Sequence, residues 1–423
     1  MRYIFLLIFA LITGCGREKA VSLRPIPYPY RAALAISSDC DKTDSLGEFL
    51  TIMRYLNTTD STPIGRGLGL EIGYSFWFFD ALHSTRFTVF KDTSFELSSA
   101  AKTIVKFIRA GYIDYLHTFG EFSLGGFIRE FAESAVAFIK RNNLKLLTWI
   151  NHGPPTNHQN VGPLSFQLGD NPGSPYYVSD LLKSVGFKFF GFYEVCHTVG
   201  QDGKRRFINY LKALKDAQAY LTGVHHWLLG FYLRNHLLEP AKLDDGYKVF
   251  HFVRYMSSMG RVAHANAEAL PRQLSPQVIE ELERKGSYMI VYTHLGDNLG
   301  PPEYFSDSTK KTLEHLAKEF HEGRLLVTTT TRLLVLNLVE RHLNWHYKVE
   351  NGKVMIFIDG IKANWKPEED DFQGLTFYTP APESTEVYIF GKKVKDVVVN
   401  PPDFTGRGSV SIQWRPLKFP EGL

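Results

Sequence analysis

The sequence predicts an α/β protein: a (β/α) barrel of about seven strands followed by a small all-β C-terminal domain. Up to about residue 340, short apolar runs alternate with amphipathic stretches of helical spacing, which is typical of parallel strands joined by helices. No glycine-rich nucleotide fingerprint follows these runs, so an open doubly wound sheet is the weaker alternative. Beyond Arg341 the runs shorten, often alternate in polarity and are separated by Gly, Pro, Asn and Asp, as in antiparallel β structure.

The composition supports a folded protein with room for about two domains. The chain has 423 residues, of which 44% are hydrophobic and 14% aromatic, and this excludes disordered, collagen-like and coiled-coil chains. The formal net charge is only +4 and is evenly spread, so nucleic acid is not expected as a partner. The aromatic content fits a protein that faces carbohydrate, although aromatic side chains also fill cores.

The first residues have the pattern of an export signal. Arg2 precedes an apolar run over residues 4–12 that is too short to stay as a membrane-spanning helix. The run ends in Leu11-Ile12-Thr13-Gly14-Cys15, which resembles a bacterial lipobox and implies cleavage before Cys15 and lipid on its sulfur. We therefore expect a signal peptide over residues 1–14, a lipidated tether over 15–29, and membrane attachment through Cys15.

Export also defines the surroundings of the protein. We expect the outer membrane or periplasm of a Gram-negative cell, or the extracellular face of the membrane in other cells. Apart from Cys15, the cysteines are Cys40 and Cys196. An oxidising compartment permits a disulfide between them, and two buried free thiols are equally compatible with the sequence.

The barrel is expected over residues 30–340. Its strands are the apolar runs at residues 32–38, 68–73, 112–117, 145–151, 187–193, 288–294 and 325–330. Helices are expected before Arg141, from Pro276 to about Lys285 with Ser275 as N-cap, and over residues 307–321. Residues 224–229 and 247–255 fit a strand or a helix equally well.

The C-terminal domain is expected over residues 341–423. Its strands are the runs at residues 353–358, 375–378, 385–390, 394–399 and 408–414. We expect a small antiparallel sandwich that caps the barrel, and glycan binding by this domain is the alternative.

Polar side chains collect where the predicted strands end. In βα barrels the chemistry lies at the carboxyl ends of the strands. Carboxylates and imidazoles stand there at Asp39, Asp41, His117, Glu121, His152, Glu194, His197, His294 and Asp297. Together such ligands suit one divalent metal ion, with zinc first and other transition metals next. We expect His197, like His158 and the pair at residues 225–226, to be structural.

Two of these strand ends resemble motifs of the polysaccharide deacetylase-like superfamily of carbohydrate esterases. In that family a strand ends in two acids, one the general base and one a metal ligand, and Asp39-Cys40-Asp41 resembles this pair with a cysteine between. The next motif is a histidine, a Ser or Thr, two further residues and a second histidine. His117 and Thr118 match its start, and Glu121 stands at the place of the second histidine. The resemblance implies a metal held by Asp41, His117 and Glu121, with Asp39 as base, or with the two acids exchanged.

A third motif resembles the late strand of that family, which ends in a histidine that acts as general acid. His294 follows its apolar run in the same way. The arginine-proline motif of the family is absent after the fourth strand, where Trp149 and His152 stand instead. His152 is a further candidate for metal or substrate, Trp149 for a sugar contact, and Asp297 for orienting His294. The resemblance covers about residues 30–335 and implies a distorted βα barrel.

The resemblance implies metal-dependent hydrolysis of N-acetyl or O-acetyl groups on a cell-envelope or extracellular glycan. In that reaction Asp39 takes a proton from water and His294 gives one to the leaving group. Two other classes stay open. A glycoside hydrolase on a similar barrel would use Glu121 and Glu194 and needs no metal. A non-catalytic glycan-binding surface lipoprotein would explain the absent arginine motif and the glutamate at position 121.

Overall fold

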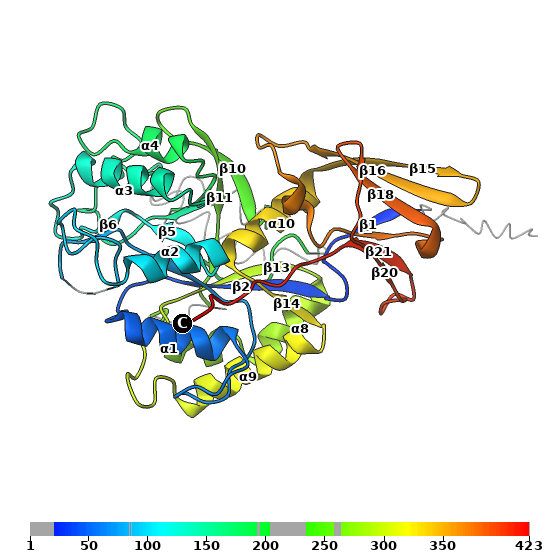
Figure 1. Ribbon diagram of the computed structural model, residues 1–423, viewed down its shortest axis with the longest axis horizontal. Coiled ribbons are helices and arrows are strands. Elements are labelled where there is room, and N and C mark those ends of the chain that lie inside the picture. The colour runs from blue at the N-terminus through cyan, green and yellow to red at the C-terminus, as the bar shows by residue number, and fades with distance from the viewer. Residues whose placement is uncertain are drawn as a thin grey trace, which may run out of the picture.

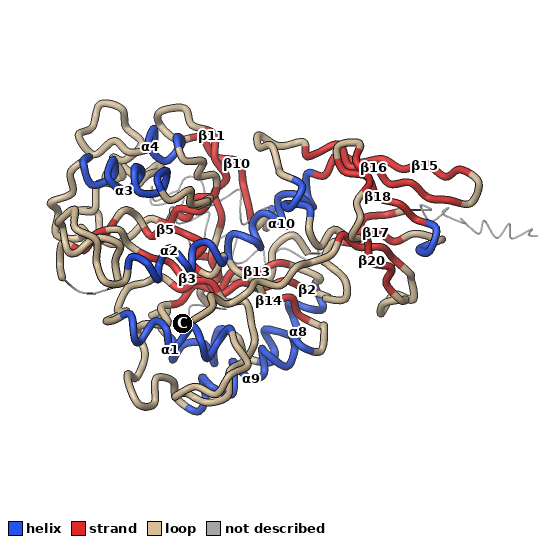
Figure 2. The backbone as a smooth tube through the Cα atoms, viewed as in Figure 1, coloured by secondary structure: helices blue, strands red, loops and turns tan. Residues whose placement is uncertain are grey.

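The computed structural model describes residues 21–83, 85, 87–192, 195–203, 234–257 and 264–422. The predicted signal peptide, Cys15 and the run at residues 224–229 lie outside the described residues. The described part is a mixed α/β structure. A curled, mostly parallel sheet is flanked by helices (Figure 1), and two smaller all-β sheets lie beside it (Figure 2). The predicted α/β class is therefore confirmed.

The large sheet has the strand order β10-β11-β8-β7-β5-β3-β2-β13-β12-β9, with β14 beside the start of β2. Neighbouring strands are parallel except for the pair β10 and β11. The strands are β2 (Ala32–Ser38), β3 (Gly73–Phe76), β5 (Ile113–His117), β7 (Thr148–Ile150), β8 (Phe189–Gly191), β9 (Val195–Cys196), β10 (Leu238–Lys242), β11 (Lys248–Phe252), β12 (Arg254–Tyr255), β13 (Tyr288–Thr293) and β14 (Leu325–Val327). A separate short pair joins β4 (Phe79–Asp80) to β6 (Gly120–Glu121).

The helices follow the amphipathic stretches of the sequence. They are α1 (Leu46–Asn57), α2 (Ala101–Ala110), α3 (Arg129–Arg141), α4 (Ser179–Ser184), α7 (Leu270–Gln273), α8 (Pro276–Lys285), α9 (Asp307–His321) and α10 (Thr330–His342). The predicted helices at residues 276–285 and 307–321 are confirmed at both ends, and α8 stops at Gly286, whose φ of 59° is left-handed. Among the described helices, none has the length and apolar character to cross a bilayer.

The central strand β2 is apolar on both faces. Leu34 and Ile36 belong to one core, whereas Ala33 and Ala35 belong to a second core that includes α10. Helix α10 covers the amino ends of β5 and β7, because the Thr331 backbone N–H donates to Asp114 Oδ2 at 2.6 Å and the Thr331 hydroxyl lies 2.7 Å from that of Thr148. The carboxyl ends of the strands lie away from this cover.

Several predicted strands were wrong in their bounds, and the runs at residues 145–151 and 187–193 are strands only over β7 and β8. Residues 68–72 do not join the sheet, because Leu68, Leu70 and Ile72 bond to the last turn of α1 and to the Asn57 side chain, and β3 begins only at Gly73. The run at residues 325–330 ends as a strand at Val327, since α10 begins at Thr330. The ambiguous run at residues 247–255 forms β11 and β12.

The C-terminal part forms two four-stranded sheets, with the orders β1-β17-β21-β20 and β15-β16-β18-β19. Their strands are β1 (Ser22–Arg24), β15 (Leu343–Glu350), β16 (Lys353–Ile361), β17 (Thr376–Tyr378), β18 (Thr385–Ile389), β19 (Lys392–Lys393), β20 (Val397–Asn400) and β21 (Ser409–Ile412). The expectation of purely antiparallel strands was wrong: the chain crosses to β17 in the other sheet before it returns as β18, so β16 and β18 are parallel. Strand β1, from the predicted tether, pairs with β17.

A buried ion pair holds β1 to these sheets. Arg24 Nε lies 2.9 Å from Asp403 Oδ2, which also accepts a 2.7 Å bond from the Tyr378 hydroxyl. Burial alone would raise the pKa of Asp403, but hydrogen bonds from Thr405, Tyr378 and Arg24 outweigh it and lower the pKa to about 2.

Asp403→Asn is therefore expected to lower the free energy of unfolding by about 2 kcal/mol at pH 7. Because the folded-state pKa is depressed, this stabilisation is present above about pH 4 and disappears as the pH falls through about 2. Urea unfolding of parent and variant at pH 7 and pH 3 measures the difference. An equal gap at both pH values would contradict the prediction.

Candidate metal centre

Five of the predicted site residues meet at the carboxyl edge of the large sheet. Asp39 and Asp41 follow β2, His117 ends β5, His152 follows β7, and His294 follows β13. Neighbouring parallel strands end at the same edge, so side chains distant in the sequence gather there. Asp39, His117 and His152 are buried, while Asp41 and His294 are about one-fifth exposed.

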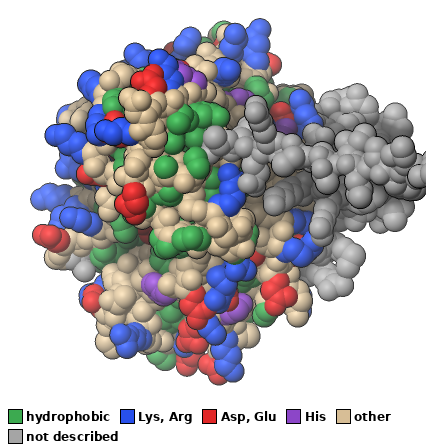
Figure 3. Space-filling model, turned by 90° about the vertical axis from the view of Figure 1, so that its right-hand side faces the viewer, with side chains coloured by type: hydrophobic (Ala, Val, Ile, Leu, Met, Phe, Trp, Pro, Cys, Tyr) green, Lys and Arg blue, Asp and Glu red, His purple; other side chains and the backbone are tan. Residues whose placement is uncertain are grey.

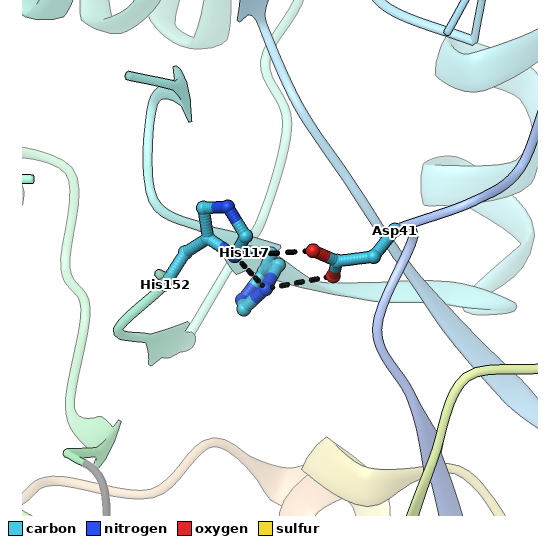
Figure 4. Close-up of side chains that lie close together, drawn as sticks. All are labelled: Asp41, His117 and His152. Atoms are coloured by element: carbon cyan, nitrogen blue, oxygen red, sulfur yellow. Dashed lines mark hydrogen bonds and ion pairs between the residues drawn. The ribbon is translucent and has the colours of Figure 1, made fainter. Parts of the chain in front are cut away.

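Asp41, His117 and His152 form a small triangle of ligand atoms. His117 Nε2 lies 3.1 Å from Asp41 Oδ2, His152 Nδ1 lies 3.2 Å from Asp41 Oδ1, and the two ring nitrogens are 2.9 Å apart (Figure 4). A tetrahedral ion with ligands at about 2.0–2.1 Å has ligand–ligand edges of about 3.3 Å. The three spacings are close to such edges, with the two histidines each facing a different Asp41 oxygen, and three protein ligands leave a fourth position for water or substrate.

The bonding of these atoms also fits a cation. Among the described residues Asp41 Oδ2 is buried without a hydrogen-bond partner, although it faces His117 Nε2 and, at 3.5 Å, His294 Nε2. Burial would raise the pKa of Asp41, but His152 and His117 outweigh it and lower the pKa. Burial would lower the pKa of His152, whereas Asp41 and Glu121 raise it to about 9. The cluster thus attracts positive charge, and its nitrogen and carboxylate donors suit a divalent transition ion.

Glu121 does not lie among the converging ligand atoms. Its Oε2 is 2.7 Å from His152 Nε2, on the opposite side of that ring from Asp41, and its Oε1 accepts a 2.7 Å bond from the Ser123 N–H. The structure therefore places His152 where the sequence led us to expect Glu121, with Glu121 as the carboxylate that orients the ring.

Asp39 lies beside the triangle and is held by an arginine. Arg254 Nη1 is 2.8 and 2.9 Å from the two Asp39 oxygens, and the Tyr115 hydroxyl donates to Oδ1 at 3.3 Å. Burial would raise the pKa of Asp39, but Arg254, His117 and His294 outweigh it and lower the pKa. Asp39 also groups with Asp41 and His294 as potential ligands. Because the guanidinium occupies both Asp39 oxygens, the triangle with His152 is the better cation site.

Arg254 was missed by the sequence analysis. It lies on β12, in a run that fits either a strand or a helix. A lone arginine within the apolar run from Phe250 to Tyr255 was the available signal, since a buried charge needs a partner.

His294 presents one ring nitrogen to the centre. Its Nδ1 lies 2.6 Å from the Ala265 carbonyl oxygen, which fixes the proton on Nδ1 and leaves Nε2 facing Asp41. Asp297 was expected to orient this ring, but its side chain is exposed and only its backbone joins the turn after His294. The Ala265 carbonyl has that role instead.

Trp149 does not face the site. It is fully buried against Phe119 and Phe187, and its Nε1 donates to Asn151, so stacking on a sugar is excluded for it. Trp77 packs on the site instead: its ring lies parallel to His117 with centroids 5.9 Å apart and edge-on to His152 at 4.9 Å. Nothing in the sequence pattern singled out Trp77.

The remaining candidates lie elsewhere. Glu194 is outside the described residues, and Glu121 is engaged by His152. His158 and His197 bond to backbone carbonyls away from the triangle. Cys40 and Cys196 are both buried and do not form a disulfide with each other.

Comparison with known proteins leaves the site to be interpreted from its geometry. No protein-family model matches the chain, and no curated protein matches it either.

Proposed function

We propose that the protein is a metal-dependent hydrolase that removes N-acetyl or O-acetyl groups from a cell-envelope or extracellular glycan. The observation that carries the proposal is the triangle of Asp41, His117 and His152 beside an ionised, arginine-paired Asp39. Three protein ligands with an open position are typical of catalytic rather than structural zinc sites. Asp39, Asp41 and His117 of this set also carry the resemblance to polysaccharide deacetylases, whereas His152 does not.

In this proposal each side chain has one role. Asp41, His117 and His152 would hold the ion, and zinc is the first candidate. When bound, such an ion supplies Lewis-acid polarisation of the carbonyl and an acidified water. Asp39 takes the proton of the attacking water, because Arg254 keeps its carboxylate ionised. His294, with Nε2 toward the centre, delivers a proton to the leaving amine or alcohol.

We also propose that the strands of the large sheet form a closed, distorted, seven-stranded barrel. Strands β8 and β9 are consecutive in the chain, as are β11 and β12. Pairing of β8 with β11, of β9 with β12, and of β12 with β13 supports a ring that returns to β2. In that ring the catalytic groups all lie at one mouth.

The partner and the location are also proposals. Membrane attachment through lipidated Cys15 would leave only residues 16–21 before β1. This spans at most about 25 Å, so the two C-terminal sheets would lie near the membrane. Basic and acidic side chains are mixed over the face in Figure 3, so that face has no uniformly basic surface for nucleic acid, and the glycan partner is proposed from the resemblance.

The first test is the metal content of the mature chain with Cys15 replaced by serine. After reconstitution with Zn²⁺, we expect about one ion per chain and acetate release from an N- or O-acetylated glycan. A parent chain that takes up no ion would overturn the proposal. Metal binding with glycan binding but no acetate release would favour the non-catalytic alternative.

A further inference from the structure

Three amide side chains are fully buried next to the metal centre. Asn157, Gln159 and Asn160, here called the amide clamp, are each 0% exposed in the loop that follows His152. Burial of an amide is unfavourable unless its donors and acceptors are bonded. The bonds that these side chains make therefore show what the loop is built to hold.

Two of them hold the backbone of His152. Asn160 Oδ1 accepts from the His152 N–H at 3.0 Å, and Asn160 Nδ2 donates to the His152 carbonyl at 2.9 Å. Asn157 Nδ2 donates to the same carbonyl at 2.9 Å. Asn160 thus engages both backbone groups of His152, as a neighbouring strand would.

The third amide holds the turn between His117 and Glu121. Gln159 Oε1 accepts from the Phe119 N–H at 2.9 Å, and Gln159 Nε2 donates to the Gly120 carbonyl at 3.0 Å and to Asn157 Oδ1 at 2.8 Å. Thr118 in that turn has a φ of 57°, an unfavourable value for a β-branched residue, which needs support from its surroundings.

We infer that the amide clamp sets the separation of the His117 and His152 imidazoles, and that Asn160 is a positioning residue for the metal. The clamp connects the carboxyl ends of β5 and β7 and the orienting Glu121. The inference rests on the proposed metal site, and goes beyond it by assigning the loop its role. Rigid placement of ligand rings by their surroundings raises metal affinity.

The test is a titration of the apo chain with Zn²⁺, and of Asn160→Ala beside it. We expect the dissociation constant of the variant to rise by about 10- to 100-fold, with a changed visible spectrum of the Co²⁺ form. Asn157→Ala should lose less Zn²⁺ affinity than Asn160→Ala, because Asn160 still donates to the His152 carbonyl. Gln167→Ala is the matched control. Gln167 is also buried in the same loop, but its side chain accepts a hydrogen bond from the Leu164 N–H.

Each result decides the matter. If Asn160→Ala binds Zn²⁺ as tightly as the parent, or if Gln167→Ala loses as much Zn²⁺ affinity as Asn160→Ala, the inference is overturned and the proposed function stays intact. A parent that binds neither Zn²⁺ nor Co²⁺ overturns both. If circular dichroism shows that Asn160→Ala does not fold, Asn157→Ala is the deciding variant. Weaker Zn²⁺ binding by Asn157→Ala, with Gln167→Ala unaffected, supports the role of the clamp. Zn²⁺ binding by Asn157→Ala with the affinity of the parent refutes it.

Discussion

His152→Ala is expected to abolish stoichiometric Zn²⁺ binding while the chain stays folded. The substitution removes one of three converging ligand side chains and leaves Asp41 without one of its three imidazole neighbours. The loss of affinity should exceed the roughly 100-fold upper end seen for outer-shell partners. Glu121→Gln keeps an acceptor for His152 and should cost only about 10- to 100-fold. Metal analysis after dialysis and Zn²⁺ titration measure both variants.

His158→Ala is the matched control for this prediction. It removes the same side chain from the same loop, but its ring bonds to the Phe166 carbonyl and packs on Tyr176, away from the triangle. We expect His158→Ala to bind Zn²⁺ with the affinity of the parent. The opposite ranking, with Glu121→Gln losing metal and His152→Ala retaining it, would restore Glu121 as the ligand and refute our assignment.

Removal of the Asp39–Arg254 pair is expected to have the largest effect on turnover. Asp39→Asn removes the base and should lower kcat by about 10²- to 10⁴-fold with the metal retained. Arg254→Met leaves a buried carboxylate without its cation, so we expect a loss of about 3–5 kcal/mol in unfolding free energy as well as of activity. Acetate release, metal content and urea unfolding are the measurements.

The double variant Asp39→Asn with Arg254→Met separates charge from packing. Because no unpaired buried carboxylate remains, it should be more stable than Arg254→Met alone, although equally inactive. A double variant that is less stable than either single variant would show that the two side chains do not act as a pair.

Local sequence signals were sufficient to locate the main strands, although they fixed the exact ends of only some of them. Strand β2 has the predicted bounds because a run of seven apolar or small residues precedes Asp39. Asp41 and His294 follow the neighbouring strands β2 and β13, and His117 ends β5, which is separated from β2 by β3 alone; parallel order in one sheet brings such ends to the same edge. The α9 bounds also followed from local signals, since its capping residue and the glycine at position 323 flank an amphipathic run.

The features of the site that the sequence did not predict depend on the directions in which side chains point in the folded chain. Whether Glu121 or His152 faces Asp41 is decided by the path of the loop after β7, which is set by buried amide bonds and not by spacing. Arg254 reaches Asp39 from a strand 215 positions away in the chain. No local pattern encodes that contact, and only the requirement that a buried charge be paired anticipates a partner at all.

The placement of β1 and β2 has a consequence for the order of folding during synthesis. Ala33 pairs with Tyr288, and Ser22 pairs with Tyr378, so the first strands to be made wait for partners from the last third of the chain. At roughly 5–20 residues per second, that delay lasts on the order of tens of seconds. Because these pairs are far apart in the sequence, the contact order is high and folding to the native state is slow. Strands β3, β5, β7 and β8 can pair with one another earlier, but β1 and the edge of β2 that faces β13 stay unpaired until the C-terminal strands arrive. A chain exported as its signal pattern predicts is therefore incompletely folded until its last third has been made.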